Sequence, residues 1–222
     1  MGEIVSFSSN GGTAQGYLAK PASGAGKGVI VFQEWWGLND NIKGIADRFA
    51  VEGFVALAPD MYHGVVTAEP TEAGKLLMAL NIAQAEKDVR GAVAYLKALT
   101  GGPVGTTGFC MGGALSLFTA CKNGPDVGAC IDYYGGHPAV TYDWDTLKAP
   151  VLAFWAEQDD FVNPNIPKYE EALKSRNHAY EAIQYPGTQH AFFNDEHTDG
   201  AFNKVAADDS WRRSLAFFRA NL

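Results

Sequence analysis

The chain has 222 residues, of which 47% are hydrophobic and 19% are charged. This length and composition are typical of a globular protein built as one α/β domain. The 17 basic and 25 acidic residues give a formal net charge of −8. That balance argues against a nucleic-acid partner or an anionic membrane surface, because both call for clustered positive charge.

The apolar runs and the cysteines indicate in which compartment the protein is expected. No apolar run approaches the roughly 18 residues that a membrane span needs, and the first residues lack the pattern of a secretory signal. The three cysteines, Cys110, Cys121 and Cys130, are an odd number without metal-ligand spacing. We therefore expect free thiols, a cytoplasmic protein and no bound metal.

Short apolar runs alternate with helical patterns along almost the whole chain. The turn Asn10-Gly11-Gly12 predicts a hairpin between the first two strands. Strands are expected at residues 3–8, 13–19, 28–33, 54–58, 104–108, 127–133, 150–155 and 178–185, and helices at 39–49, 71–80, 82–99, 164–174 and 201–218. This alternation predicts a mostly parallel sheet with helices on both faces. No linker or repeat interrupts it, so residues 1–222 are expected to form a single domain.

The most informative segment is Gly-Phe-Cys-Met-Gly-Gly at residues 108–113, which lies between a predicted strand and a predicted helix. A nucleophile flanked at two residues by small side chains is the nucleophile-elbow pattern of α/β-hydrolases. The glycines are needed because the turn is too sharp for large neighbouring side chains. The nucleophile in this chain is Cys110 rather than the more usual serine.

Two more loops carry side chains that suit such a nucleophile. Asp159 and His190 each directly follow a predicted strand, and the chain order is nucleophile, acid, histidine. In an open α/β sheet, loops at the carboxyl ends of the strands gather at one edge. A thiol needs a base, and the base needs an acid that holds its tautomer. We therefore expect Cys110, His190 and Asp159 to form a triad. Asp160 competes with Asp159, which is preferred for its spacing from the strand.

The block Gln-Glu-Trp-Trp-Gly at residues 33–37 follows the third predicted strand. This is where the architecture places its second oxyanion-hole amide, so the backbone N–H groups of Trp35 and Met111 are the predicted oxyanion donors. Glu34 is expected at the mouth of the site, within reach of the thiol. An acidic residue between a buried strand and two tryptophans is costly without a role.

Taken together, these motifs make the chain resemble the dienelactone hydrolase (carboxymethylenebutenolidase) family over nearly its full length. The segments that carry the resemblance are residues 33–39, 58–62, 108–113, 158–162 and 189–192. The resemblance implies an α/β-hydrolase fold and a Cys-His-Asp triad that opens an ester or lactone through a thiol acyl-enzyme. It also implies that the glutamate at position 34 takes the thiol proton when substrate arrives.

One departure from the family concerns the substrate. Dienelactone hydrolases hold the substrate carboxylate with two arginines, one near the helix after the Pro-Asp-x-Tyr block and one four residues after the catalytic histidine. Here the second position is Asn194, and residues 63–87 contain only Lys75 and Lys87 as basic residues other than histidine. Neither a lysine nor an amide reproduces a bidentate guanidinium clamp. The resemblance therefore supports the chemistry at Cys110 more strongly than the dienelactone substrate.

The expected activity is hydrolysis of a small lactone, enol ester or activated ester, with no cofactor. Two alternatives stay open: a general small-substrate carboxylesterase or lactonase without dienelactone activity, and a non-catalytic thiol sensor. Cys121 and Cys130 are expected in the core. The sequence does not determine the oligomeric state, and a monomer is the default. The expected pocket walls are Trp36, Tyr134, Phe193 and Asn194.

Overall fold

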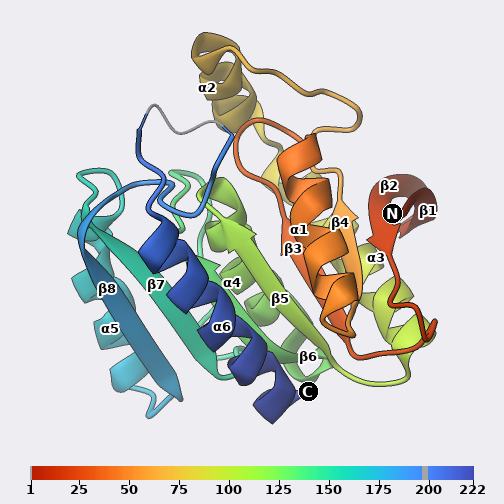
Figure 1. The fold of residues 1–222 in the computed structure, drawn as a ribbon. Helices are drawn as coiled ribbons and strands as arrows, with labels where there is room; N and C mark the ends of the chain where they lie inside the picture. Colours follow the sequence, from red (N-terminus) through yellow and green to blue (C-terminus); the bar gives the residue numbers. More distant parts are fainter. Residues whose placement is uncertain (1, 197–199) are drawn as a thin grey trace.

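The molecule is built on one eight-stranded sheet (Figure 1). This computed structural model describes residues 2–196 and 200–222. The strands are β1 (Glu3–Ser9), β2 (Gly12–Ala19), β3 (Gly28–Phe32), β4 (Val55–Pro59), β5 (Val104–Phe109), β6 (Val127–Tyr133), β7 (Val151–Gln158) and β8 (Tyr180–Gln189). The helices are α1 (Asp40–Val51), α2 (Pro70–Ala79), α3 (Ile82–Thr100), α4 (Met111–Asn123), α5 (Ile166–Lys174) and α6 (Lys204–Asn221), with 3-10 turns η1 (Gly124–Asp126) and η2 (Asn163–Asn165).

The strand order is β1-β2-β4-β3-β5-β6-β7-β8. The pairs β1–β2 and β2–β4 are antiparallel, and all other neighbours are parallel. The chain order reverses between β3 and β5, which pair with Phe32 opposite Gly108. Because the carboxyl ends of these two strands adjoin, the loops that follow them lie side by side at the reversal point, where α/β sheets bind ligands. The predicted α/β-hydrolase fold is confirmed.

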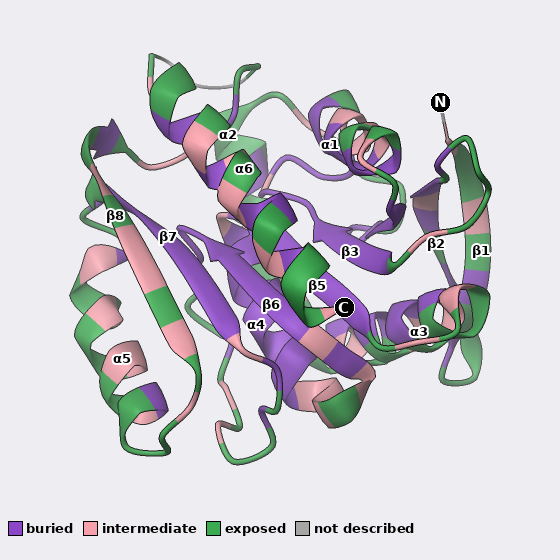
Figure 2. Cartoon of the chain, turned by 60° about the horizontal axis from the view of Figure 1, so that its bottom comes forward, coloured by how far each residue is buried: buried purple, intermediate pink, exposed green. Residues whose placement is uncertain are grey.

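Helices cover both faces of the sheet (Figure 1). Helices α1 and α6 pack on one face, and α3, α4 and α5 pack on the other. The central strands β3 and β5 are buried at every position, whereas β1 and β8 at the two edges carry exposed residues (Figure 2). This is the expected burial when apolar helices cover both faces of a parallel sheet.

The predicted elements differ from the observed ones mainly at their ends. The last helix begins at Lys204 rather than at residue 201, because Asn203 caps it by accepting a hydrogen bond from the N–H of Ala206. The helix predicted at 164–174 begins as the 3-10 turn η2 and becomes α-helical only at Ile166. Strand β8 runs to Gln189, four residues beyond the predicted end, and therefore leads directly to His190.

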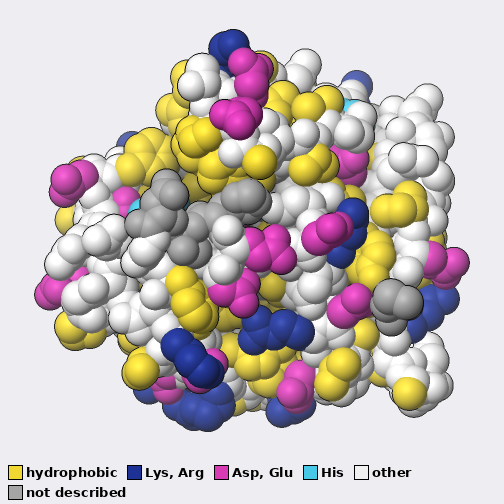
Figure 3. Space-filling model, turned by 45° about the horizontal axis from the view of Figure 1, so that its top comes forward, with side chains coloured by type: hydrophobic (Ala, Val, Ile, Leu, Met, Phe, Trp, Pro, Cys, Tyr) yellow, Lys and Arg dark blue, Asp and Glu magenta, His cyan; other side chains and the backbone are white. Residues whose placement is uncertain are grey.

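Helix α2 lies beyond the carboxyl ends of the strands, at the top of Figure 1. Ala73 is its one buried residue in the described part of the chain. Val65 and Val66, which precede α2, and Met78 within it are 46%, 52% and 69% exposed. Hydrophobic side chains gather around α2 on the face seen in Figure 3, and α2 itself also carries an exposed ion pair between Lys75 and Glu72.

Within residues 2–196 and 200–222, no helix combines the length and the apolar character that a membrane crossing would need.

Candidate active site

Cys110 occupies a strained turn between β5 and α4. Its backbone has φ 56° and ψ −120°, a region that non-glycine residues rarely adopt and that often marks functional sites. A Cβ atom on Gly112 would lie 2.5 Å from the carbonyl oxygen of Gln33, and one on Gly108 would overlap the carbonyl of Gly112. Both glycines are therefore required, Gly108 by a contact within the elbow and Gly112 by the backbone at the end of β3.

Backbone hydrogen bonds hold the elbow in place. The Cys110 N–H donates to the carbonyl of Tyr133 at 3.1 Å, and the Cys110 carbonyl accepts from the N–H groups of Gly113 at 3.0 Å and Gly136 at 3.3 Å. The partly exposed thiol thus lies at the N-terminal end of α4. The partial positive charge of a helix N-terminus stabilises a thiolate.

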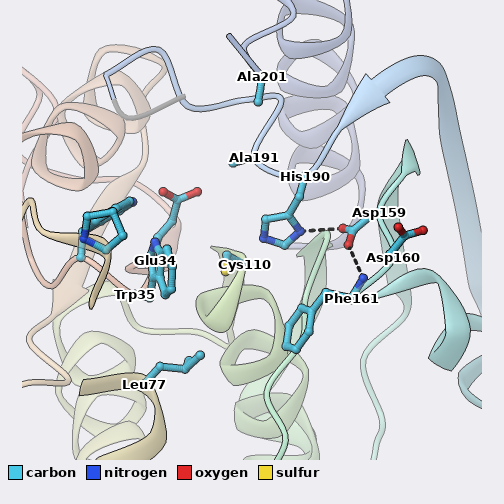
Figure 4. A pocket seen from close by; sticks show the side chains of 12 residues that line it. Glu34, Trp35, Leu77, Cys110, Asp159, Asp160, Phe161, His190, Ala191 and Ala201 are labelled. Carbon is cyan, nitrogen blue, oxygen red and sulfur yellow. Dashed lines mark hydrogen bonds and ion pairs between the residues drawn. The ribbon is translucent and has the colours of Figure 1, made fainter. Parts of the chain in front are cut away.

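His190 and Asp159 meet in the same region. His190 Nδ1 lies 2.6 Å from Asp159 Oδ2, and the side chains are 30% and 1% exposed. The other carboxylate oxygen, Oδ1, accepts from the N–H groups of Phe161 at 3.1 Å and Val162 at 3.0 Å. The imidazole lies between Cys110 and Asp159 in Figure 4. Because the carboxylate accepts the proton of Nδ1, Nε2 is left for the thiol.

The electrostatics of this pair follow from its geometry. Burial by itself lowers the pKa of His190, but the charge of the neighbouring Cys110 and the hydrogen bond to Asp159 outweigh it and raise the pKa well above 6.5. Burial raises the pKa of Asp159, and the bonds from His190 and the two backbone amides more than offset this, so the net pKa is lowered. Both shifts favour an imidazolium–carboxylate pair.

Glu34 lies on the opposite side of Cys110 from His190 (Figure 4) and is only 3% exposed. Its Oε2 accepts a short hydrogen bond from Asn194 Nδ2, while Oε1 has no hydrogen-bond partner among the described residues. Burial raises the pKa of Glu34, and Asn194, His190 and Tyr134 reduce this effect without cancelling it. Asn194, at the position of the second family arginine, is thus the group that binds Glu34 here.

The two predicted oxyanion donors come from adjoining loops. Trp35 follows β3, and Met111 is the first residue of α4, where an N–H group has no acceptor within its own helix. Strands β3 and β5 are neighbours, so these loops lie beside the same nucleophile. Trp35 also packs edge-on against Trp36, with ring centroids 5.0 Å apart.

A cavity of about 610 Å³ opens above Cys110. Its lining combines the loops that carry Cys110, Asp159 and His190 with the loop after β3 and helix α2. The lining residues are Glu34, Trp35, Trp36, Pro70, Leu77, Cys110, Asp159, Asp160, Phe161, His190, Ala191 and Ala201.

Of the four expected wall residues, Trp36 lines the cavity. The other three do not line it. Tyr134, Phe193 and Asn194 are only 0%, 4% and 2% exposed, and their side chains are buried beneath the residues that form the cavity wall. Aromatic packing accounts for this position, since Phe109 stacks on Phe193 with ring centroids 4.9 Å apart.

Sequence reasoning did not find Pro70, Leu77 and Phe161 as wall residues. Pro70 and Leu77 belong to α2, whose sequence carries no signal of a position over the site. Phe161 directly follows the acid pair 159–160, and this position was the one hint in the sequence. In the described part of the chain, no group of three histidine, cysteine or carboxylate side chains could hold a metal ion.

The Dienelactone hydrolase family profile matches residues 14–222. "Protein usf" of Aquifex pyrophilus is 38% identical over 233 aligned positions, and a protein of Aquifex aeolicus named "Putative carboxymethylenebutenolidase" is 33% identical, both with full coverage of both chains. The crystal structure of a "Putative Dienelactone Hydrolase" from Klebsiella pneumoniae subsp. pneumoniae superposes with a TM-score of 0.86 at 28% identity, over 99% of this chain and 98% of that one. The chain belongs to the dienelactone hydrolase family.

Proposed function

We propose that this family hydrolase opens a small lactone, enol ester or activated ester with Cys110 as its nucleophile. The observation that carries the proposal is the alignment of Cys110 at a helix N-terminus with His190, whose Nδ1 is bonded to the buried Asp159. A thiol aligned in this way has both a base and an orienting acid, which nucleophilic catalysis requires.

In the first half of the reaction, the thiol proton passes to Glu34 or His190, and the thiolate adds to the substrate carbonyl. The N–H groups of Trp35 and Met111 stabilise the charge on the carbonyl oxygen. The carbon–oxygen bond to the leaving group then breaks, His190 donates a proton to the departing oxygen, and a thioester remains on Cys110.

In the second half, neutral His190 takes a proton from water, and the resulting hydroxide adds to the thioester carbonyl. Collapse of this intermediate breaks the carbon–sulfur bond and releases the acid, and the sulfur of Cys110 takes back its proton from the group that accepted it, Glu34 or His190. Asp159 stabilises the imidazolium that forms in each half. The thioester sulfur carries no charge, so in this step it is the hydrogen bond to Asp159 that raises the pKa of His190 and strengthens it as a base.

The surroundings of Glu34 support its role as a proton acceptor. A fully exposed glutamate is a weak base at neutral pH, whereas the buried Glu34 has a raised pKa, which makes proton uptake easier. The hydrogen bond from Asn194 holds one carboxylate oxygen and leaves the other without a described partner.

A general small-ester hydrolase without dienelactone activity is the second candidate. The described lining of the catalytic cavity includes Glu34, Asp159 and Asp160 but no lysine or arginine. An acidic lining without a guanidinium clamp disfavours a substrate carboxylate inside this cavity. Rates on a dienelactone and on an uncharged ester of similar size would separate the two candidates.

The decisive experiment uses p-nitrophenyl acetate. The wild-type protein should release p-nitrophenol, Cys110→Ala should lose that release, and Cys121→Ala should retain it because Cys121 is buried away from the site. Mass spectrometry of rapidly quenched protein should find an acetyl group on Cys110. Full activity in Cys110→Ala would overturn the proposal. Oxidation of Cys110 without any ester turnover would support the thiol sensor instead.

A further inference from the structure

A second cavity of about 420 Å³ opens beside the catalytic one. Phe161 lines both cavities. A second link is His137, which lines the new cavity and lies with Nε2 3.0 Å from the carbonyl oxygen of Leu77, a residue of the catalytic cavity. The N–H of Ala139 donates to His137 Nδ1, so Nε2 carries the proton and donates to Leu77. The two cavities therefore share a wall at two points.

The lining of the second cavity suits an aromatic group. Tyr142, Trp144 and Tyr169 form a ring cluster with centroids 5.0 to 5.9 Å apart. The first two lie in the segment between β6 and β7, and Tyr169 lies on α5. Aromatic clusters of this kind bind planar rings through stacked and edge-to-face contacts.

The same cavity also differs in charge from the catalytic one. Lys168, next to Tyr169, is part of its lining, and no acidic side chain is found among the described lining residues. No described carboxylate forms an ion pair with Lys168. An ammonium group at the rim of an aromatic cavity favours a ligand with an anionic substituent.

The geometry of the triad indicates which part of a substrate reaches this cavity. His190 must lie beside the leaving oxygen that it protonates. The Phe161 ring packs edge-on toward His190 at 6.4 Å, whereas Glu34 and Trp35 lie on the other side of Cys110 (Figure 4). The alcohol part of an ester therefore points past Phe161, and the acyl part points toward Trp35.

We propose that the second cavity is the leaving-group subsite and that it takes a planar aromatic alcohol carrying an anionic substituent. The ring packs against Tyr142, Trp144 and Tyr169, and the anion binds Lys168. This inference rests on the proposed function, because a leaving group exists only if Cys110 cleaves an ester. In this proposal Lys168 binds the negative charge of the substrate. The described lining of the catalytic cavity has no lysine or arginine that could do so.

The test compares two acetate esters of similar shape, 2-naphthyl acetate and 6-acetoxy-2-naphthoate. Lys168→Met should raise KM about tenfold for the carboxylated ester and leave KM for the neutral ester unchanged, since a charge-assisted hydrogen bond is lost. Lys174→Met is the matched control, because Lys174 is an exposed lysine of the same helix that pairs with Glu170 outside the cavity. It should change neither value.

A second variant tests the aromatic wall. Trp144→Ala should raise KM severalfold for both naphthyl esters and leave KM for vinyl acetate, which has no aromatic leaving group, unchanged. An equal loss on all three esters would show general damage to the enzyme and would overturn the assignment of the ring cluster.

Binding of the product alone separates the subsite from the proposed function. The Kd of 6-hydroxy-2-naphthoate is measured by its fluorescence in Cys110→Ala protein, with and without Lys168→Met. A Kd about tenfold weaker with Lys168→Met supports binding of an anionic aromatic alcohol in the second cavity. If no ester is cleaved, the proposed function fails while this binding site stands. Cleavage of the esters with KM and Kd unaffected by Lys168→Met and Trp144→Ala would overturn the subsite alone.

Discussion

Helix α4, which begins directly after Cys110, and helix α2, which supplies Pro70 and Leu77, lie at the cavity above Cys110, but they are held in the fold in opposite ways. The eleven residues of α4 from Met111 to Cys121 are all buried, and backbone bonds hold its first turn to the segment that ends β6. Helix α2 buries Ala73 alone within the described chain, and His137 donates a single side-chain hydrogen bond to its Leu77 carbonyl.

This difference separates two requirements of the site. A nucleophile must be held close to one geometry relative to its base and oxyanion donors, which the buried α4 provides. A substrate-facing wall does not carry reacting atoms, and a weakly packed helix changes position at low free-energy cost. We infer that reaction chemistry depends on α4 and its neighbours, while α2 adjusts the range of substrates.

The largest expected effect concerns the chemistry at Cys110, which the buried helix α4 holds in place. Asp159→Asn should lower kcat by roughly 10³- to 10⁴-fold, because His190 loses the carboxylate that orients it and stabilises its imidazolium. Asp160→Asn is the matched control, since Asp160 lines the cavity beside it without a hydrogen bond to His190 among the described contacts. Steady-state kinetics on p-nitrophenyl acetate would measure both. Equal losses in the two variants would contradict the assignment of the acid.

A matched pair of glycine substitutions tests the packing difference directly. Gly112→Ala should lower the free energy of unfolding by about 1–3 kcal/mol, since its Cβ would lie 2.5 Å from two backbone oxygens. Gly74→Ala in α2 should raise it by about 0.5–1 kcal/mol, because its Cβ meets only Trp35 Cζ3 at 3.9 Å and alanine favours a helix. Urea unfolding would measure both. Changes of the same sign would contradict the comparison.

Glu34→Gln should lower the activity of the protein but raise its thermal stability. The loss of a proton acceptor should reduce kcat/KM roughly 10²-fold, while removal of a buried charge should raise Tm at neutral pH. The folded pKa of Glu34 lies above 4.5, so the wild-type carboxyl is most stabilising below pH 4.5, and this stability is lost as the pH rises through the folded pKa.

The Tm advantage of Glu34→Gln should therefore grow as the pH increases from about 4.5 to 7. Thermal unfolding at several pH values would check the trend. Glu157→Gln, at an exposed position, serves as the control. A Tm difference independent of pH would argue against a raised pKa for Glu34.

The smallest expected effect concerns the attachment of α2. His137→Ala removes the donor to the Leu77 carbonyl, a hydrogen bond worth about 1 kcal/mol. Amide hydrogens of α2 should then exchange about fivefold faster, while those of α4 keep their rates. His137→Gln, which retains a side-chain N–H donor, should restore much of the protection. Faster exchange in α4 as well would mean that the two helices are coupled more tightly than their packing indicates.

The elbow at Cys110 and the two side chains expected beside it could be predicted from short stretches of sequence. The elbow at Cys110 could be recognised because its glycines are required by contacts within a few residues of the turn or by the neighbouring strand. Asp159 and His190 could be chosen because parallel strands bring the loops at their carboxyl ends together. The expected roles of these residues in catalysis remain predictions, although the structure brings Asp159 and His190 into contact.

Other features depend on contacts between distant parts of the chain. Asn194 binds Glu34 across 160 residues of sequence, and no local pattern predicts such a pair. Asn194, Tyr134 and Phe193 were expected to line the pocket, but all three side chains are buried and absent from its lining. For Phe193 and Asn194 the reason is that a position shortly after the predicted catalytic histidine does not reveal which way a side chain points.

The alternation of strands and helices, the elbow and the family resemblance could all be recognised from the sequence, since each follows from local sterics or from short motifs in a set order. The two cavities could not: α2 supplies a wall of the cavity above Cys110, and Phe161 lies between it and a second, aromatic cavity with Lys168 at its rim. A cavity is shaped by segments from several elements packed together, and their relative positions are encoded in no single stretch of sequence.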